Sequence, residues 1–128
     1  MVEHLTKSEL AIMEVMWDQE DALTAAEIIK VSGDKEWKNS SVHLLVNALL
    51  EKNFIEVAGF KKTTKNYART FKPTMTREQY LTRKVLGNMT AKERMRIYSQ
   101  LLQEIDDAEV LDDIQKHIAV RRKELENL

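Results

Sequence analysis

The chain contains no cysteine, and its 128 residues include only one proline and three glycines. Without cysteine it can form neither disulfides nor thiolate metal sites. So few helix-breaking residues leave most of the chain free to be helical. Its apolar runs stay well short of the ~20 residues that span a membrane. The first residues also lack the basic and apolar regions of a signal peptide. We therefore expect a mainly α-helical, cytoplasmic protein.

Residue patterns that carry enzymatic chemistry are also missing. The sequence has no cysteine nucleophile, no glycine-rich phosphate loop and no cluster of metal ligands. Ser40 and Ser41 resemble catalytic partners of His43 only in their closeness along the sequence. Scattered methionines at helical spacing are typical of core packing rather than of copper binding. The sequence therefore predicts no enzyme, no metal site and no cofactor.

Charge is distributed unevenly along a chain whose net charge is only −1. Residues 1–36 hold three lysines or arginines and nine acidic residues, residues 37–73 hold seven and two, and residues 74–128 hold ten of each. The middle segment is therefore a basic block. Such a block favours contact with nucleic-acid phosphates, although a solvated lysine-rich loop would have the same composition.

The first part of the chain is predicted to form three short helices. Capping boxes, in which threonine is followed three residues later by glutamate, open the first two helices at Thr6 and Thr24. The third helix covers residues 40–52. Its apolar positions recur at the spacing of one buried helix face, and they are Val42, Leu45, Val46 and Leu49. Three such helices are typical of a helix-turn-helix core.

A β-hairpin is predicted directly after the third helix. Residues 54–57 read as a strand, residues 59–66 as a polar, lysine-rich loop, and residues 67–71 as the returning strand, which Pro73 ends. A helix-turn-helix followed by a basic hairpin is the pattern of a winged-helix domain, with the hairpin as its wing. We place this domain at residues 1–73.

Residues 74–128 are predicted to form amphipathic helices that begin near Thr76, Thr90 and Asp107. A segment of this length is marginal for a stable core of its own. Its apolar stripes would be buried either against a second copy or against the same chain's N-terminal domain, and we favour a helical dimerisation domain. The dimerisation residues predicted are Tyr98, Leu101, Leu102, Ile105, Leu111, Ile114 and Ile118.

The two elements that would meet DNA supply the candidate site residues. A helix-turn-helix places its recognition helix in the major groove, where asparagine can pair with adenine and apolar side chains can contact thymine methyl groups. The base-reading residues predicted on this basis are Ser40, Ser41, His43, Leu44 and Asn47. The phosphate-contacting residues predicted are Lys38, Lys61, Lys62, Lys65 and Arg69.

Four stretches of the sequence follow one another in a characteristic order. They are Leu5-Thr6-x-x-Glu9-x-x-Ile12-Met13-x-x-Met16-Trp17, Leu23-Thr24-Ala25-Ala26-Glu27-Ile28, Asp34-Lys35-Glu36-Trp37 with Ser41-Val42, Leu45, Leu49 and Lys52, and Phe71-x-Pro73 with Thr76 to Tyr80. Together they resemble the penicillinase repressor family over residues 5 to about 80. The resemblance implies a homodimer with winged N-terminal domains and a helical C-terminal dimerisation domain. It also implies repression of transcription through double-stranded DNA operators of dyad symmetry.

The sequence departs from the family pattern in the helix that would read DNA. The family commonly has Thr-Val-x-Thr-Leu-Leu-x-Arg-Leu there, and this chain has Ser41 and Leu44 for the two threonines and Ala48 for the arginine. Leu44 and Ala48 could contact thymine methyl groups or a protein partner. A winged-helix protein-interaction module that has lost specific DNA reading therefore stays open as the alternative function.

Two further departures concern the wing and its regulation. Asn53 replaces the glycine that precedes the wing in the family. Some family members are released from DNA when a sensor protease cleaves an Asn-Phe bond in the dimerisation domain. Asn53-Phe54 is the only Asn-Phe pair here, and it lies outside that domain. The partners predicted are DNA and a second copy, with the effector or sensor protein left open.

Overall fold

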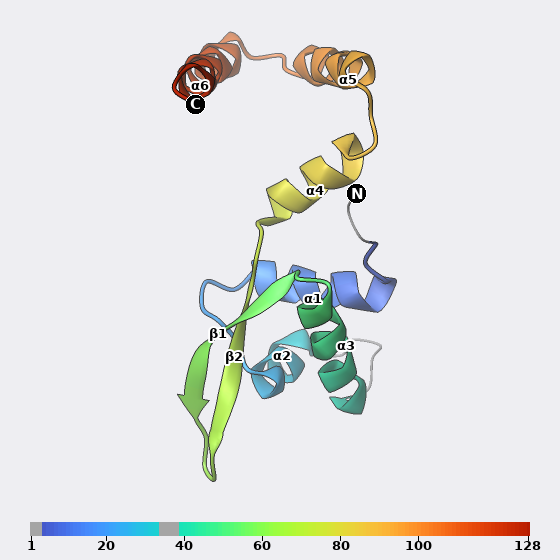
Figure 1. Ribbon diagram of the computed structural model, residues 1–128, viewed down its shortest axis with the longest axis vertical. Helices are drawn as coiled ribbons and strands as arrows, with labels where there is room; N and C mark the ends of the chain where they lie inside the picture. Colours follow the sequence, from blue (N-terminus) through green and yellow to red (C-terminus); the bar gives the residue numbers. More distant parts are fainter. Residues whose placement is uncertain (1–3, 34–38) are drawn as a thin grey trace. The chain divides into compact units, whose positions relative to one another are not determined.

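The structure is a computed structural model that describes residues 4–33 and 39–128, without the side chains of Asn39 and Ser40. Its elements are α1 (Lys7–Trp17), α2 (Ala25–Ser32), α3 (Asn39–Glu51), β1 (Ile55–Lys62), β2 (Tyr67–Pro73), α4 (Arg77–Leu86), α5 (Ala91–Gln103) and α6 (Ala108–Glu126). The predicted class, mainly α with a small β-wing, is confirmed (Figure 1). By its contacts the chain divides into Met1–Gly87 and Asn88–Leu128.

Helices α1, α2 and α3 pack against one another and form the core of the first unit (Figure 1). The predicted capping boxes are present, since Thr6 and Thr24 each cap the backbone N–H of the glutamate three residues later. Gly33, at φ +60°, ends α2. The buried apolar side chains are Ile12, Met13, Met16, Leu23, Ile28, Val42, Val46, Leu49, Phe54, Ile55, Phe71 and Tyr80. They include most of the stripe predicted for the third helix.

A Schellman motif turns the chain out of α3 and into the wing. The N–H of Phe54 donates to the carbonyl of Leu49 (3.0 Å), and the N–H of Asn53 donates to the carbonyl of Leu50 (3.1 Å). Asn53 itself has φ +63°, the left-handed conformation that this motif requires at the residue after the cap. Asparagine adopts it more readily than other residues with a side chain. The replacement of the family's glycine is therefore compatible with the same exit geometry.

The wing is longer than the sequence indicated. Strand β1 continues through Gly59 to Lys62, with an irregularity between Val57 and Gly59, and it pairs antiparallel with β2 up to Lys62 opposite Tyr67. The prediction of a loop from residue 59 was wrong, because polar and lysine residues can occupy a strand that is exposed on most of its surface. The turn itself is left with residues 63–66. A bridge between Leu23 and Phe71, which the sequence did not reveal, fastens the base of β2 beside the start of α2.

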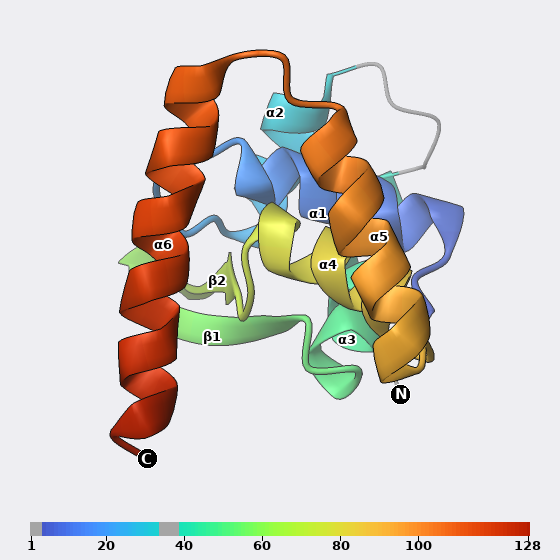
Figure 2. The ribbon, with the colours of Figure 1, turned by 90° about the horizontal axis from the view of Figure 1, so that it is seen from above.

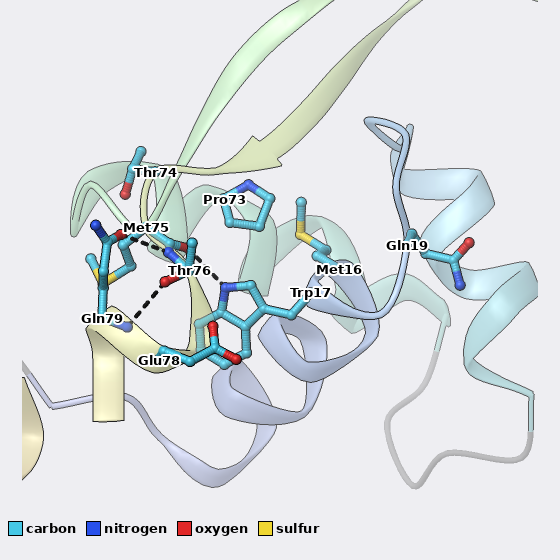
Figure 3. A pocket seen from close by; sticks show the side chains of 9 residues that line it. All are labelled: Met16, Trp17, Gln19, Pro73, Thr74, Met75, Thr76, Glu78 and Gln79. Carbon is cyan, nitrogen blue, oxygen red and sulfur yellow. Dashed lines mark hydrogen bonds between the residues drawn. The ribbon is translucent and has the colours of Figure 1, made fainter. Parts of the chain in front are cut away.

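Helix α4 is held to the end of α1 by a cluster around Trp17. Its indole N–H donates to the carbonyl of Met75 (2.9 Å), and its ring lies 5.6 Å from that of Tyr80. Arg77 forms ion pairs of 2.8 Å with both Glu14 and Asp18. A pocket of about 390 Å³ lies beside this junction. Figure 3 shows the side chains that line it, among them Trp17 and Met75. These contacts explain why the first unit extends past Pro73 to Gly87. The division into a DNA-binding domain before residue 74 and a dimerisation domain after it stays a prediction.

The second unit contains two amphipathic helices with no core between them. The capping box at Thr90 opens α5 as predicted, and the side chain of Asp107 caps α6. Figures 1 and 2 show α5 and α6 lying apart from each other. Within Asn88–Leu128 no side chain is fully buried. Of the predicted dimerisation residues Ile105 and Ile114 are half-buried, and the rest are exposed, namely Tyr98, Leu101, Leu102, Leu111 and Ile118.

Among the described residues, no helix combines the length and apolar character that would be needed to cross a membrane.

Candidate DNA interface

Helix α3 presents its predicted reading face to solvent. Val42, Val46 and Leu49 are buried on the opposite side, which fixes the rotation of the helix about its axis. His43, Leu44 and Asn47 are consequently exposed, and Ser41 is half-buried. Leu44 is 72% exposed, the largest exposed fraction of any large apolar side chain in the described part of the first unit.

A groove of about 240 Å³ brings part of this face together with two other elements. Its lining residues are His43, Val46 and Asn47 of α3, Thr24, Ala25 and Ala26 at the start of α2, and Thr63, Ala68, Arg69 and Phe71 of the wing. Three predicted site residues, His43, Asn47 and Arg69, thus share one groove. Ser41 and Leu44 are not among its lining residues; Leu44 is exposed and Ser41 is half-buried.

The start of α2 is a contributor that the sequence prediction missed. The first N–H groups of a helix have no partner inside the helix and carry the positive end of its dipole, so they favour a phosphate. Ala25 and Ala26 follow the capping residue Thr24, and their small side chains permit close approach. The capping box at Thr24 was recognised in the sequence. It could have identified this helix end, although not its place beside α3 and the wing.

The basic block is partly neutralised by carboxylates that are remote in sequence. Lys52 pairs with Glu9 (2.8 Å), Lys61 pairs with Glu27 (2.7 Å), and Lys72 pairs with Glu56 (3.4 Å). The charge count along the sequence therefore overstated the positive charge available to a ligand, because two of these three partners come from the acidic first segment.

The remaining predicted phosphate contacts lie in different situations. Lys62 and Lys65 are exposed, and the guanidinium of Arg69 lies over the ring of Phe71, 5.3 Å from its centre. Lys38 and the side chain of Ser40, both predicted site residues, lie outside the part of the chain that the structure describes.

Glu27 is a second residue that the prediction missed as part of the site. The hydrogen bond from Lys61, together with that from the backbone N–H of Thr24, holds the pKa of Glu27 below its usual value. The carboxylate is therefore charged at neutral pH and remains the partner of Lys61. The capping box in the sequence assigned Glu27 a role at the start of α2. It gave no indication of the second partner, Lys61.

The comparison with protein families agrees with this geometry. The model described as penicillinase repressor matches residues 5–120. The chain belongs to the penicillinase repressor family. The match extends beyond residue 80, where the sequence resemblance ended, and it reaches into α6. This repressor is accordingly a DNA-binding transcriptional regulator and not an enzyme, as its sequence predicted.

Solved structures of other regulators resemble the chain at low sequence identity. PadR of Bacillus subtilis, in complex with operator DNA, is 15% identical with a TM-score of 0.50, over 98% of this chain and 74% of PadR. The adhesin competence repressor of Streptococcus pyogenes is 20% identical with a TM-score of 0.44, over 95% and 81%. A MarR/EmrR family regulator from Acinetobacter sp. ADP1 is 21% identical with a TM-score of 0.42, over 97% and 78%. At these identities the likeness to PadR concerns the fold. A search of the curated proteins found no match.

Proposed function

We propose that this repressor binds a dyad-symmetric operator as a homodimer, with α3 of each copy in the major groove. The observation that carries the proposal is the groove in which His43 and Asn47 of α3 meet the start of α2 and Arg69 of the wing. A base edge beside Asn47 and a phosphate beside the N–H groups of α2 are the two chemistries that this groove can accept. PadR, which has the same fold, binds operator DNA.

Within this proposal the residues have separate roles. His43, Leu44 and Asn47 read bases, assisted by Ser40 and Ser41, and Leu44 contacts a thymine methyl group. Lys62, Lys65 and Arg69, together with Lys38, contact phosphates and supply affinity without base preference. The protein acts in the cytoplasm, where it meets its operator.

The apolar stripes of α5 and α6 support the proposed dimerisation. Side chains such as Leu101 and Leu102 are exposed in the single chain, and a second copy would remove them from water. A two-fold symmetric dimer reads half-sites one helical turn, or a multiple of a turn, apart. This spacing would follow from the symmetry of the dimer rather than from any single residue.

The test is fluorescence anisotropy with duplex from the region upstream of the protein's own gene and a scrambled control, across a salt series. Asn47→Ala should reduce the preference for the native duplex by about 1–3 kcal/mol without changing the salt slope. Lys62→Ala combined with Lys65→Ala should weaken both duplexes alike and reduce the slope by about 0.9 for each phosphate that is no longer neutralised. Equal losses on both duplexes for Asn47→Ala would remove its reading role.

The exposure of Leu44 favours a second candidate, a winged-helix module that binds protein. An apolar interface of this kind would be nearly independent of salt, whereas DNA binding through several phosphates falls steeply as ionic strength rises. The same salt series therefore separates the two functions.

A further inference from the structure

Glu27 connects the wing to α2 through both oxygens of one carboxylate. Its Oε1 accepts the backbone N–H of Thr24 (3.0 Å), which completes the capping box of α2. Its Oε2 accepts from the ammonium of Lys61 (2.7 Å), near the far end of β1. The partners are 34 residues apart in sequence, so this ion pair belongs to the tertiary fold.

The position of Lys61 along the wing lets the ion pair restrain the outer half of the hairpin. The base of the wing is fastened where Leu23 and Phe71 exchange backbone hydrogen bonds of 3.0 and 2.7 Å. Lys61, opposite Ala68, lies one pair short of the turn. A two-stranded hairpin is only marginally stable by itself. An attachment at the base alone would leave the outer half of the wing mobile relative to α2. The ion pair adds a second attachment near the turn.

This second attachment, the ion pair between Lys61 and Glu27, borders the groove described above. Ala68, the strand partner of Lys61, lines the groove together with Arg69, and Ala25 and Ala26, which precede Glu27, line it from α2. The separation between the wing and α2 therefore depends on the pair. The side chain of Lys62 points to the opposite face of the strand from that of Lys61, because successive residues of a strand alternate between its two faces.

We propose that Glu27 is a positioning residue that sets the distance between the wing and α2, the two elements that form the groove together with α3. Lys61 then holds the wing through this ion pair and is not a phosphate contact. The proposal rests on the proposed DNA-binding function and revises the role predicted for Lys61. Since the ammonium of Lys61 is already neutralised by Glu27, it releases no counterion from DNA.

The experiment compares Glu27→Gln, Lys61→Met and their double variant in the full-length protein. Glutamine still completes a capping box, so Glu27→Gln removes the ion pair and leaves the cap. We expect each single variant to weaken operator binding by about fourfold, the scale of an exposed ion pair. The double variant should lose no more than either single variant. In Lys61→Met and in the double variant, which both lack the ammonium, the salt slope should stay at the wild-type value.

Two matched controls accompany these variants. Glu56→Gln breaks the ion pair with Lys72, which lies wholly within the hairpin, and it removes the same charge without releasing the wing from α2. Lys62→Ala removes a neighbouring lysine and should reduce the salt slope by about 0.9, the value for one phosphate. Amide hydrogen exchange of the free protein supplies a readout without DNA. Exchange over residues 61–68 should accelerate in Glu27→Gln and Lys61→Met but not in Glu56→Gln.

Opposite results would overturn the proposal. If Lys61 binds phosphate, Lys61→Met will reduce the salt slope as Lys62→Ala does, and Glu27→Gln will tighten binding by freeing the ammonium. Unchanged hydrogen exchange in Glu27→Gln and Lys61→Met would also contradict the role of the ion pair in holding the wing. Failure of the proposed function is a separate outcome, because the wild-type protein would then show no preference for the native duplex.

Discussion

The two units of the chain differ in how far they bury their apolar side chains. In the described part of Met1–Gly87, the helices α1 to α4 and the hairpin enclose a continuous core. In Asn88–Leu128, α5 and α6 have equally regular amphipathic patterns, yet no side chain there is fully buried. Periodicity thus predicts a helix and its apolar face equally well in both units. Whether the same chain covers that face is decided by tertiary contacts.

The largest expected effect is a loss of stability in the first unit. Leu49 is 0% exposed, in the centre of its core, and Leu49→Ala should lower the free energy of unfolding by about 3 kcal/mol. Leu101→Ala, at an exposed position of α5, is the matched control and should leave the unfolding of the first unit unchanged. Urea denaturation followed by tryptophan fluorescence reports on that unit through Trp17. Equal losses of unfolding free energy for Leu49→Ala and Leu101→Ala would contradict this difference between the units.

A smaller effect is expected on association through the second unit. Leu102→Asp places a charge in the exposed apolar stripe of α5. Burying an unpaired charge in a dimer interface is costly, so the dimer dissociation constant should rise by about a hundredfold, or about 2.7 kcal/mol. Gln100→Asp, on the same helix outside the stripe, should change it little. Sedimentation equilibrium measures both constants, and a wild-type monomer at micromolar concentration would contradict the dimer.

The smallest effect concerns the ion pairs of the two units. Glu9 is 3% exposed and bonded to Lys52, and Glu9→Gln should cost about 1–2 kcal/mol at neutral pH. Arg121 and Glu124 of α6 form an exposed pair, so Glu124→Gln should cost close to nothing.

The contribution of Glu9 should also depend on pH. Burial pushes the pKa of Glu9 upward, but hydrogen bonds from Lys52 and Thr6 outweigh it and leave that pKa below its usual value. A carboxyl with a lowered pKa in the folded state stabilises the protein above its unfolded pKa and loses that contribution as pH falls through the folded one. The difference between wild type and Glu9→Gln should therefore be constant above about pH 5 and shrink below about pH 4. Urea titrations at several pH values measure it, and a difference that grows on acidification would contradict the assignment.

Local signals in the sequence were sufficient for most of the fold. The capping boxes at Thr6, Thr24 and Thr90 each begin a helix because their hydrogen bonds span only three residues. The exposure of His43, Leu44 and Asn47 followed from helical periodicity in the same way.

Contacts between distant residues were beyond the reach of such signals. The bridge from Leu23 to Phe71 and the ion pair from Glu27 to Lys61 join segments that nothing local links. The burial of Tyr80 against Trp17 and Phe54 likewise depends on three separate elements. The sequence therefore predicted which face of α3 is exposed and available to DNA under the proposed function, but neither the groove nor the positive charge that remains available there.

The conformation of Asn53 also limits how this chain can evolve. At φ +63° the backbone accepts glycine, asparagine or aspartate at little cost, and a β-branched residue would be strained there. Of the substitutions that one base change in an asparagine codon can produce, aspartate keeps the turn, whereas isoleucine and threonine would disturb it. Glycine cannot be reached from asparagine by one base change, so a lineage moving between the two residues has aspartate or serine as its intermediate. Selection on the turn alone would favour the route through aspartate.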